Sequence, residues 1–207
     1  MRPYVTINAA MSLDGRLALN TGEQTRLSSE EDMDRVRLLR NSVDAILVGV
    51  GTVISDDPGL SPNGDVLRVV LDTNGRTPPG SLVMRPPPRT LVALGPDASM
   101  DAPEGVIVRN YPLKGDVVDI GRVLKDLGSM DVRELLVEGG GRVISEFLNR
   151  GLFDVLQVFV ADRIIGGEAV SLATGNGAFT MDEMVHLEFV ECRRLDGGVL
   201  LTYRQPG

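Results

Sequence analysis

The chain has 207 residues, of which 43% are hydrophobic and 24% charged, so it is long enough and balanced enough to form a globular core. Its formal charge of −8 argues against a nucleic-acid-binding protein, which usually presents a basic face. The single cysteine excludes an internal disulfide, and no apolar run or secretory signal suggests a membrane segment or export. We therefore expect one cytoplasmic domain over residues 1–207.

The strand and helix signals alternate along the chain. Apolar and β-branched runs predict strands over residues 4–10, 43–49, 67–71, 90–94, 106–108, 132–137 and 155–161. Ser28 at the N-cap and Glu31 at N3 form a capping box, which predicts a helix ending near Asn41. Further helices are expected over residues 117–127 and after the glycines at 139–141, and a closing hairpin over residues 185–203. This order predicts an α/β fold with a mixed sheet flanked by helices.

Histidine and cysteine, the nitrogen and sulfur ligands of zinc, are almost absent. His186 is the only histidine and Cys192 the only cysteine, so no nitrogen- and sulfur-rich metal site can be assembled and none is expected. The zinc-deaminase signature is also missing. A Ser-His-Asp triad would need His186, which lies in an alternating stretch that is typical of a strand. A core or surface histidine is the simpler interpretation.

The most informative segment is residues 135–144, where an apolar run ends in Glu138 and the three glycines Gly139, Gly140 and Gly141. A helical pattern follows. Glycines at a strand-to-helix turn let a ligand approach the backbone, and a helix start favours phosphate. In open α/β sheets, ligands bind at the carboxyl ends of strands. One glycine would satisfy a tight turn, whereas three in succession favour nucleotide or phosphate binding.

A second glycine-bearing turn, Gly49-Val50-Gly51, follows the strand at 43–49 and enters a short helix. Neither turn matches the dinucleotide fingerprint G-x-G-x-x-G, because Ile54 and Ile144 occupy the place of the last glycine. A standard Rossmann domain is therefore not expected. The two turns could still supply backbone N–H groups to different parts of one elongated cofactor.

Two carboxylates, Asp56 and Asp57, precede Pro58 in the loop after this helix. They indicate either a simple turn or a functional pair, and both interpretations stay open. Thr52 lies four residues before Asp56, so one helical turn would bring their side chains to the same face.

Arg40 is predicted to point into the middle of the apolar stripe of the helix over residues 29–41. An arginine aimed at the sheet needs an anion, which could be a buried carboxylate or a ligand phosphate. Arg35 and Arg37 point elsewhere and are expected to be solvated.

Four segments together resemble the riboflavin-pathway reductases, in order and in approximate spacing. They are Ser12-Leu13-Asp14-Gly15-Arg16-Leu17-Ala18, Gly51-Thr52-Val53 with Asp56-Asp57-Pro58 and Leu60, Val70-Leu71-Asp72, and Glu138-Gly139-Gly140-Gly141. The chain is similar to the stand-alone archaeal and fungal 2,5-diamino-6-ribosylamino-4(3H)-pyrimidinone 5′-phosphate reductases over almost its whole length. It is also similar to the C-terminal half of the bifunctional bacterial deaminase-reductase.

This resemblance implies a dihydrofolate-reductase-like three-layer fold, with a mixed, mostly parallel sheet and a C-terminal antiparallel hairpin. It implies an oxidoreductase that uses NADPH, or alternatively NADH, to reduce C1′ of a pyrimidine ribosylamine phosphate. It also implies a homodimer. The missing deaminase motif then fits, because deamination would belong to another protein.

For the proton transfer that such a reduction needs, Asp56 and Glu138 are the candidates, and the alternative that Asp56 only positions the cofactor stays open. The resemblance also implies roles for particular residues. The cofactor positions are Ala10, Thr52, Asp56, Thr73, Gly139, Gly140, Gly141, Arg142 and Val143. The substrate positions are Gln24, Arg40, Leu60 and Glu138. Arg76 is either an anchor for the 2′-phosphate of NADPH or a solvated loop arginine.

Two other functions stay open: a dihydrofolate-reductase-like enzyme acting on another pterin or pyrimidine, and a non-catalytic NADPH-binding protein. The absence of tryptophan, and Glu138 in place of an apolar residue before the glycines, argue against the first. Retention of Asp56, Glu138 and Arg40 argues against the second.

Overall fold

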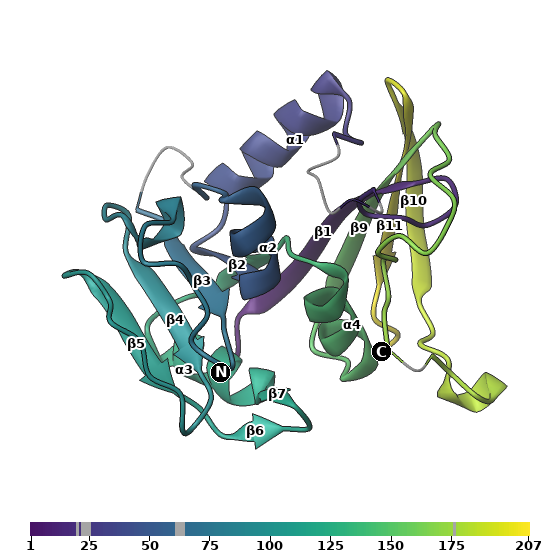
Figure 1. Ribbon diagram of the computed structural model, residues 1–207. Coiled ribbons are helices and arrows are strands. Elements are labelled where there is room, and N and C mark those ends of the chain that lie inside the picture. The colour runs from purple at the N-terminus through teal and green to yellow at the C-terminus, as the bar shows by residue number, and fades with distance from the viewer. Residues whose placement is uncertain (20, 22–25, 61–64, 176) are drawn as a thin grey trace. The chain divides into compact units, whose positions relative to one another are not determined.

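The computed structural model describes residues 1–19, 21, 26–60, 65–175 and 177–207 (Figure 1). The chain forms two compact units: unit 1 comprises Met1–Tyr4 and Leu39–Leu136, and unit 2 comprises Val5–Leu38 and Val137–Gly207. The chain passes from one unit to the other within β1 (Tyr4–Ser12), α1 (Glu30–Asn41) and β8 (Glu134–Val137). The single domain expected over residues 1–207 stays a prediction.

Unit 1 contains a run of strands in the order β8-β2-β3-β4-β5. Four of them are β2 (Ala45–Gly49), β3 (Leu67–Leu71), β4 (Thr90–Leu94) and β5 (Val106–Asn110), and they pair in parallel. The other elements are α2 (Val50–Asp56), η1 (Leu82–Met84), the short hairpin β6 (Leu113–Lys114) and β7 (Val117–Val118), and α3 (Ile120–Ser129). Every residue of β2, β3 and β4 is buried, as expected for parallel strands covered on both faces.

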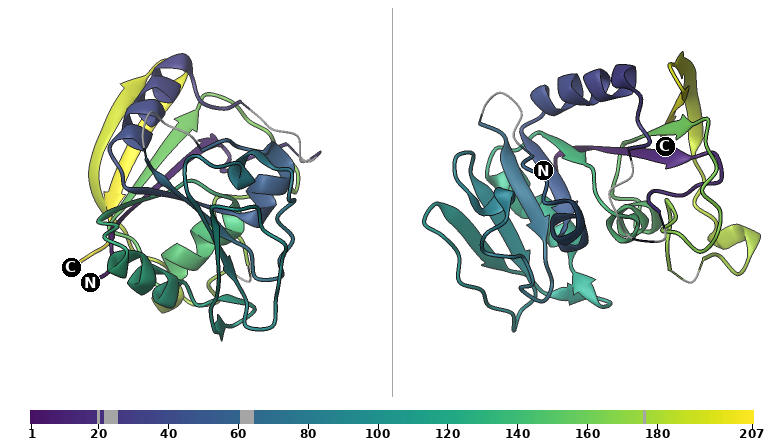
Figure 2. Two further views of the ribbon diagram at one scale, coloured as in Figure 1. Left: turned by 90° about the vertical axis from the view of Figure 1, so that its left-hand side faces the viewer. Right: turned by 45° about the horizontal axis from the view of Figure 1, so that its top comes forward.

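Unit 2 contains strands in the order β10-β11-β9-β1. Its remaining elements are α4 (Gly141–Asn149), β9 (Val155–Ala161), η2 (Met181–Glu183), β10 (Glu188–Leu195) and β11 (Gly198–Arg204). β1 and β9 are parallel, whereas β11 runs antiparallel to both β9 and β10. α1 lies along one face of β1 and β9 (Figure 2). The mixed, mostly parallel pairing and the C-terminal hairpin confirm the expected α/β class.

Several predicted boundaries were wrong; for example, the strands expected from residues 43 and 132 begin at Ala45 and Glu134. A polar group explains two of the other differences. α1 begins one residue later than predicted, because Ser29 rather than Ser28 accepts the N–H of Asp32 (3.2 Å). α3 begins at Ile120, because Asp119 caps it by accepting from the N–H of Gly121 (2.9 Å), and residues 117–118 form β7 instead. β10 begins at Glu188, so His186 is an exposed residue outside the strand.

Candidate functional site

The glycines after β8 form a tight strand-to-helix turn in unit 2. Glu138 follows the strand and is half-buried. Gly140 is the N-cap of α4 and has φ 69°, a left-handed conformation that favours glycine. Because Gly140 has no side chain, no side chain caps the helix start. Backbone N–H groups in the first turn of a helix have no intrahelical acceptor, so this uncapped turn can receive an anion.

Gly141 is explained by packing within the protein. A Cβ atom added at this position would overlap the carbonyl oxygen of Ser171 and would lie 3.0 Å from the Cγ2 of Thr174. The segment that contains these two residues therefore lies directly against the first turn of α4. In this position glycine makes room for the protein's own chain.

In unit 1, the adjacent carboxylates of Asp56 and Asp57 have different surroundings, because Asp56 is the last residue of α2 and Asp57 is its C-cap. Thr52 and Asp56 lie one helical turn apart and are both half-buried. Among the residues that the structure describes, none donates a hydrogen bond to the Asp56 carboxylate. Asp57 instead ends the helix at φ 40°, and its carboxylate accepts the N–H of Leu82 (2.7 Å). The turn interpretation thus applies to Asp57, whereas Asp56 is available to a ligand.

The remaining predicted positions are divided between the two units. Leu60 is 3% exposed in the core of unit 1, so its backbone rather than its side chain could face a ligand. Thr73 follows β3, and its hydroxyl accepts the N–H of Val118 (3.3 Å). Arg40 is half-buried in the last turn of α1. In unit 2, Ala10 is half-buried in β1, Gly139 is buried, Arg142 is exposed and Val143 is half-buried. Gln24 lies outside the described residues.

The prediction that Arg35 is solvated was wrong. Its guanidinium donates to Asn8 Oδ1 (2.7 Å) on β1, to Gln157 Oε1 (2.8 Å) on β9 and to Asp32 Oδ1 (2.8 Å) on its own helix. Its side chain is only 13% exposed. Arg35 therefore contacts the sheet, while Arg37 is exposed as expected.

Arg68 on β3 was missed by sequence reasoning. It is 1% exposed and donates five hydrogen bonds, all to neutral oxygen atoms. The acceptors are Thr90 Oγ1 and the carbonyl oxygens of Gly59, Leu82, Arg85 and Pro88. Burial lowers the pKa of its guanidinium. A charged residue inside an apolar run is the only sequence signal for it, and its partners lie up to 22 residues away.

Asp14, in the turn after β1, accepts several hydrogen bonds from residues near and far in the sequence. Its carboxylate accepts from the hydroxyl of Ser12 (2.6 Å) and from the N–H groups of Ile165 (3.0 Å) and Gly166 (2.7 Å). These hydrogen bonds, that from Ser12 first, lower the pKa of Asp14 to about 2. The carboxylate thereby holds the segment after β9 to the turn after β1.

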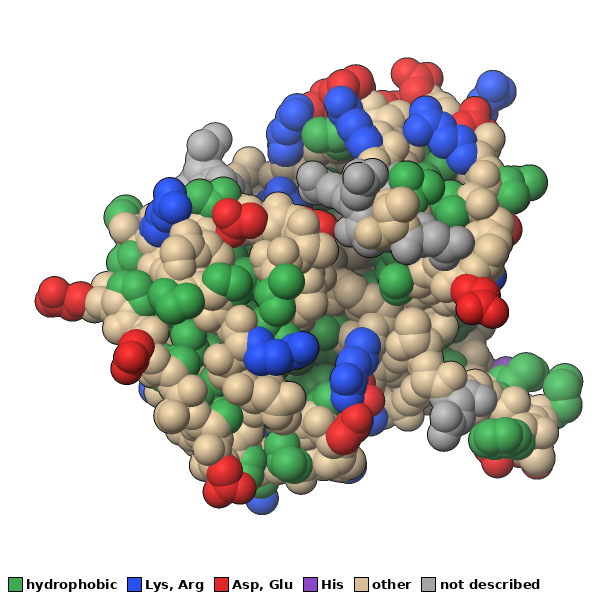
Figure 3. Space-filling view, in the orientation of Figure 1, with side chains coloured by type: hydrophobic (Ala, Val, Ile, Leu, Met, Phe, Trp, Pro, Cys, Tyr) green, Lys and Arg blue, Asp and Glu red, His purple; other side chains and the backbone are tan. Residues whose placement is uncertain are grey.

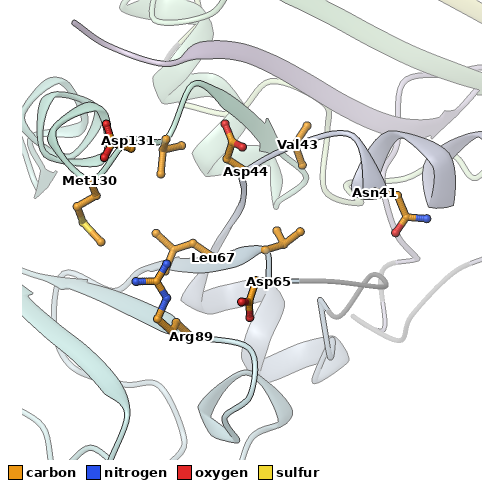
Figure 4. Close-up of a pocket in the computed structure, with 10 residues that line it drawn as sticks. Asn41, Val43, Asp44, Asp65, Leu67, Arg89, Met130 and Asp131 are labelled. Carbon is orange, nitrogen blue, oxygen red and sulfur yellow. The ribbon is translucent and has the colours of Figure 1, made fainter.

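A cavity of about 340 Å³ lies in unit 1 at the amino ends of the strands (Figure 4). Its lining residues are Asn41, Val43, Asp44, Asp65, Val66, Leu67, Arg89, Met130, Asp131 and Val132. None of the predicted site residues is among them. Because ligands of α/β sheets bind at the carboxyl ends, where Asp56 and Thr73 lie, this cavity is not the candidate site.

Among the helices that the structure describes, none is long and apolar enough to cross a membrane. Residues 3–201 match the family model of the RibD C-terminal domain. The chain is 35% identical over 217 aligned positions to the 2,5-diamino-6-ribosylamino-4(3H)-pyrimidinone 5′-phosphate reductase of Methanothermobacter thermautotrophicus, with all of both chains covered. It is 37% identical over 189 positions to the protein of that name from Archaeoglobus fulgidus, covering 81% of this chain and 84% of the relative.

Solved structures share the fold. The diaminohydroxyphosphoribosylaminopyrimidine deaminase/5-amino-6-(5-phosphoribosylamino)uracil reductase of Thermotoga maritima superposes with a TM-score of 0.84 at 27% identity, over 99% of this chain and 57% of that one. The riboflavin biosynthesis reductase of Saccharomyces cerevisiae superposes with a TM-score of 0.80 at 23% identity, over 99% and 90%. The chain thus spans little more than half of the bifunctional protein and most of the yeast reductase.

Proposed function

The chain belongs to the RibD C-terminal domain family, and we propose that it reduces 2,5-diamino-6-ribosylamino-4(3H)-pyrimidinone 5′-phosphate to the ribitylamino product in riboflavin biosynthesis. The observation that carries this proposal is the match to the reductase of Methanothermobacter thermautotrophicus, which covers both chains completely. The reductant is a nicotinamide cofactor, as the reductase family indicates.

The first turn of α4 fits the phosphates of such a cofactor. It begins with a left-handed glycine, it has no side-chain cap, and Arg142 is exposed beside it. In unit 1, Thr52 and Asp56 share one face of α2 and would contact the cofactor, as would Thr73. We assign NADPH rather than NADH because the exposed Arg76 can pair with a 2′-phosphate. In unit 2, Ala10, Gly139, Gly140, Gly141 and Val143 complete the proposed cofactor residues.

The substrate is a glycosylamine whose ring-opened form is an imine at C1′. When bound, NADPH supplies a hydride to this carbon, and the neighbouring nitrogen must gain a proton. The half-buried carboxyl groups of Asp56 and Glu138 are the proposed groups that hold or relay that proton. Arg40 would pair with the ribose phosphate, because a guanidinium matches its geometry. Gln24 and the backbone at Leu60 would contact the remainder of the substrate.

The first experiment follows NADPH oxidation by its ultraviolet absorbance with freshly generated substrate, with the deaminated pyrimidine and dihydrofolate in parallel. The proposal expects oxidation with the diamino compound and much less with the other two. Rapid oxidation with dihydrofolate alone would make the chain a dihydrofolate reductase. Tight NADPH binding without oxidation of any of the three would make it a binding protein.

We also propose that the protein is a homodimer. Seven of the eight residues of β10 are exposed, including Phe189 (58%) and Val190 (50%). Apolar side chains also cover the projecting segment around η2, where Phe179 is 81% and Met181 74% exposed (Figure 3). Exposed apolar surface of this kind commonly marks an interface. Light scattering coupled to gel filtration should give twice the chain mass of 22.3 kDa, and the chain mass itself would contradict the proposal.

A further inference from the structure

Residues 165–174, which we call the strap, follow β9 in unit 2. Through hydrogen bonds the strap contacts the turn after β1 at one end and the start of α4 at the other. Asp14 holds the beginning of the strap through two N–H groups, as described above. Arg16 holds its middle by donating hydrogen bonds to the carbonyl oxygens of Gly167 (2.7 Å) and Ala169 (2.9 Å) and to the hydroxyl of Ser171 (2.7 Å). The N–H of Leu172 also donates to the carbonyl of Gly15 (3.1 Å).

Ser145 holds the other end of the strap to α4. Its hydroxyl accepts the N–H of Thr174 (2.5 Å) and donates to the carbonyl of Gly141 (2.6 Å), one turn earlier in the helix. Ser145 is 4% exposed, so water cannot replace these partners easily. One buried hydroxyl thus joins the last residue of the strap to the first residue of the helix.

The start of α4 needs such external support. Gly140 and Gly141 contribute no side chains that could hold the turn, and glycine loses more conformational freedom on ordering than any other residue. The strap compensates by packing its Ser171 carbonyl against Gly141, where a Cβ atom would not fit. The conformation of the first helical turn therefore depends on the strap.

We propose that the strap fixes the first turn of α4 in the conformation that receives the cofactor phosphates, and that Ser145 is the positioning residue that joins them. This inference rests on the proposed function only in taking the cofactor to be a dinucleotide with phosphates at α4. Asp14 acts in the same way from the far end of the strap. Neither side chain needs to contact the cofactor.

The first test compares Ser145→Ala and Ser145→Cys with the unchanged protein. Ser145→Ala removes both hydrogen bonds of the hydroxyl and should raise the KM and Kd for NADPH about tenfold, which corresponds to about 1.4 kcal/mol of binding free energy. The kcat and the KM for the pyrimidine should stay within about twofold. Ser145→Cys should be intermediate, because a thiol is a weaker hydrogen-bonding group. Since Cys is larger and Ala smaller than Ser, a simple packing role would not give this ranking.

The second test uses Asp14→Ala alone and combined with Ser145→Ala. If both substitutions release the same strap, the double variant should bind NADPH little worse than the weaker-binding single variant. Additive losses would mean that the two side chains act independently and would overturn the proposal. Ser129→Ala and Asp34→Ala are matched controls: Ser129 bonds only to Asp126 within α3, and Asp34 is an exposed partner of Arg37. Both should leave NADPH affinity unchanged.

Amide hydrogen exchange without any ligand provides a readout independent of turnover. The N–H groups of Leu172 and Thr174 should exchange faster in both Ser145→Ala and Asp14→Ala, and NADPH should slow them in the unchanged protein. Unchanged exchange in both variants would overturn the strap proposal. If the protein binds NADPH as described but does not oxidise it with the pyrimidine, the proposed substrate is wrong while the strap is still supported.

Discussion

At the scale of single residues, neighbouring side chains have different surroundings. The carboxylate of Asp57 accepts a backbone N–H and shapes the end of α2, whereas none of the described residues donates to the carboxylate of Asp56, one helical turn after Thr52. The two carboxylates should therefore respond differently to the same substitution.

For Asp56→Asn we expect kcat to fall about 100-fold if the carboxylate transfers the proton, because general acid–base catalysis contributes about 10²–10⁴-fold. Steady-state kinetics with both substrates would measure it. Asp57→Asn is the matched control: asparagine keeps an oxygen for the Leu82 N–H and tolerates positive φ, so activity should stay within about twofold. A kcat for Asp56→Asn within a few-fold of the original would eliminate proton transfer by Asp56.

Removing Arg40 tests the proposed phosphate contact. Arg40→Ala should raise the KM for the pyrimidine phosphate about tenfold or more, since a hydrogen bond to a charged group contributes about 1.5–3 kcal/mol. The KM for NADPH should hardly change. Arg37→Ala, on the same helix but exposed, should leave both constants as they are. If Arg40→Ala instead raised the KM for NADPH and left the KM for the pyrimidine phosphate unchanged, Arg40 would be assigned to the cofactor site.

Arg68 should matter for stability. Arg68→Met removes all five hydrogen bonds and leaves buried carbonyl oxygens without donors, so we expect a loss of about 3–5 kcal/mol in the free energy of unfolding. Urea unfolding would measure the loss. Arg85→Met is the control: Arg85 is exposed, and its loss should cost about 0.5 kcal/mol or less. A loss below about 1 kcal/mol for Arg68→Met would show that the carbonyl groups find other partners.

At the scale of helices and strands, caps decide the boundaries. Asp119→Ala should destabilise unit 1 by about 1 kcal/mol, because the N–H groups of Gly121 and Arg122 lose their acceptor at the start of α3. Thermal unfolding would show a lower Tm. Asp119→Asn and Asp119→Ser, which restore a capping oxygen, should recover most of the loss. Equal destabilisation by all three substitutions would contradict the capping role.

The interior strands could be predicted closely from the sequence. β3, β4 and β9 have the predicted bounds. Each is a short apolar, β-branched run, and such a run is typical of a buried strand rather than of a helix. The start of α3 could not be predicted, since Val117 and Val118 are as apolar as the helix but pair with Leu113 and Lys114 instead.

Predicting the site was harder, because it depends on partners that are remote in sequence. Arg35 contacts Asn8 and Gln157, which lie 27 and 122 residues away, so helical periodicity alone could not predict its contact with the sheet. The glycines at 139–141 were recognised as a turn. That Gly141 makes room for Ser171 depends on a contact that no local pattern shows.

At the scale of the whole molecule, acid should destabilise the folded state in a narrow pH range. Asp14 has a folded pKa of about 2 against an ordinary value of 3.8. A group with a lowered folded pKa adds stability that is fully present above 3.8 and is lost as the pH falls towards 2. The difference in unfolding free energy between the unchanged protein and Asp14→Asn should therefore be constant from neutral pH to about 5 and shrink below about 4. For Ser42→Ala, whose exposed hydroxyl donates to the carbonyl of Leu39 and to no titrating group, this difference should not change with pH. A constant difference for Asp14→Asn down to pH 2 would contradict the assignment.

The parallel pairing of β1 with β9 has a consequence for synthesis on the ribosome. The hydrogen bond between Val5 and Asp154 joins residues 149 positions apart. At roughly 5–20 residues per second, β1 leaves the ribosome about 7–30 seconds before β9. During that interval the apolar side chains of Val5, Ile7 and Ala9 lack the strand that lies beside them in the folded protein. A nascent chain stalled before β9 would present an unpaired apolar strand to its neighbours, so this protein should depend on chaperones most strongly while it is being translated.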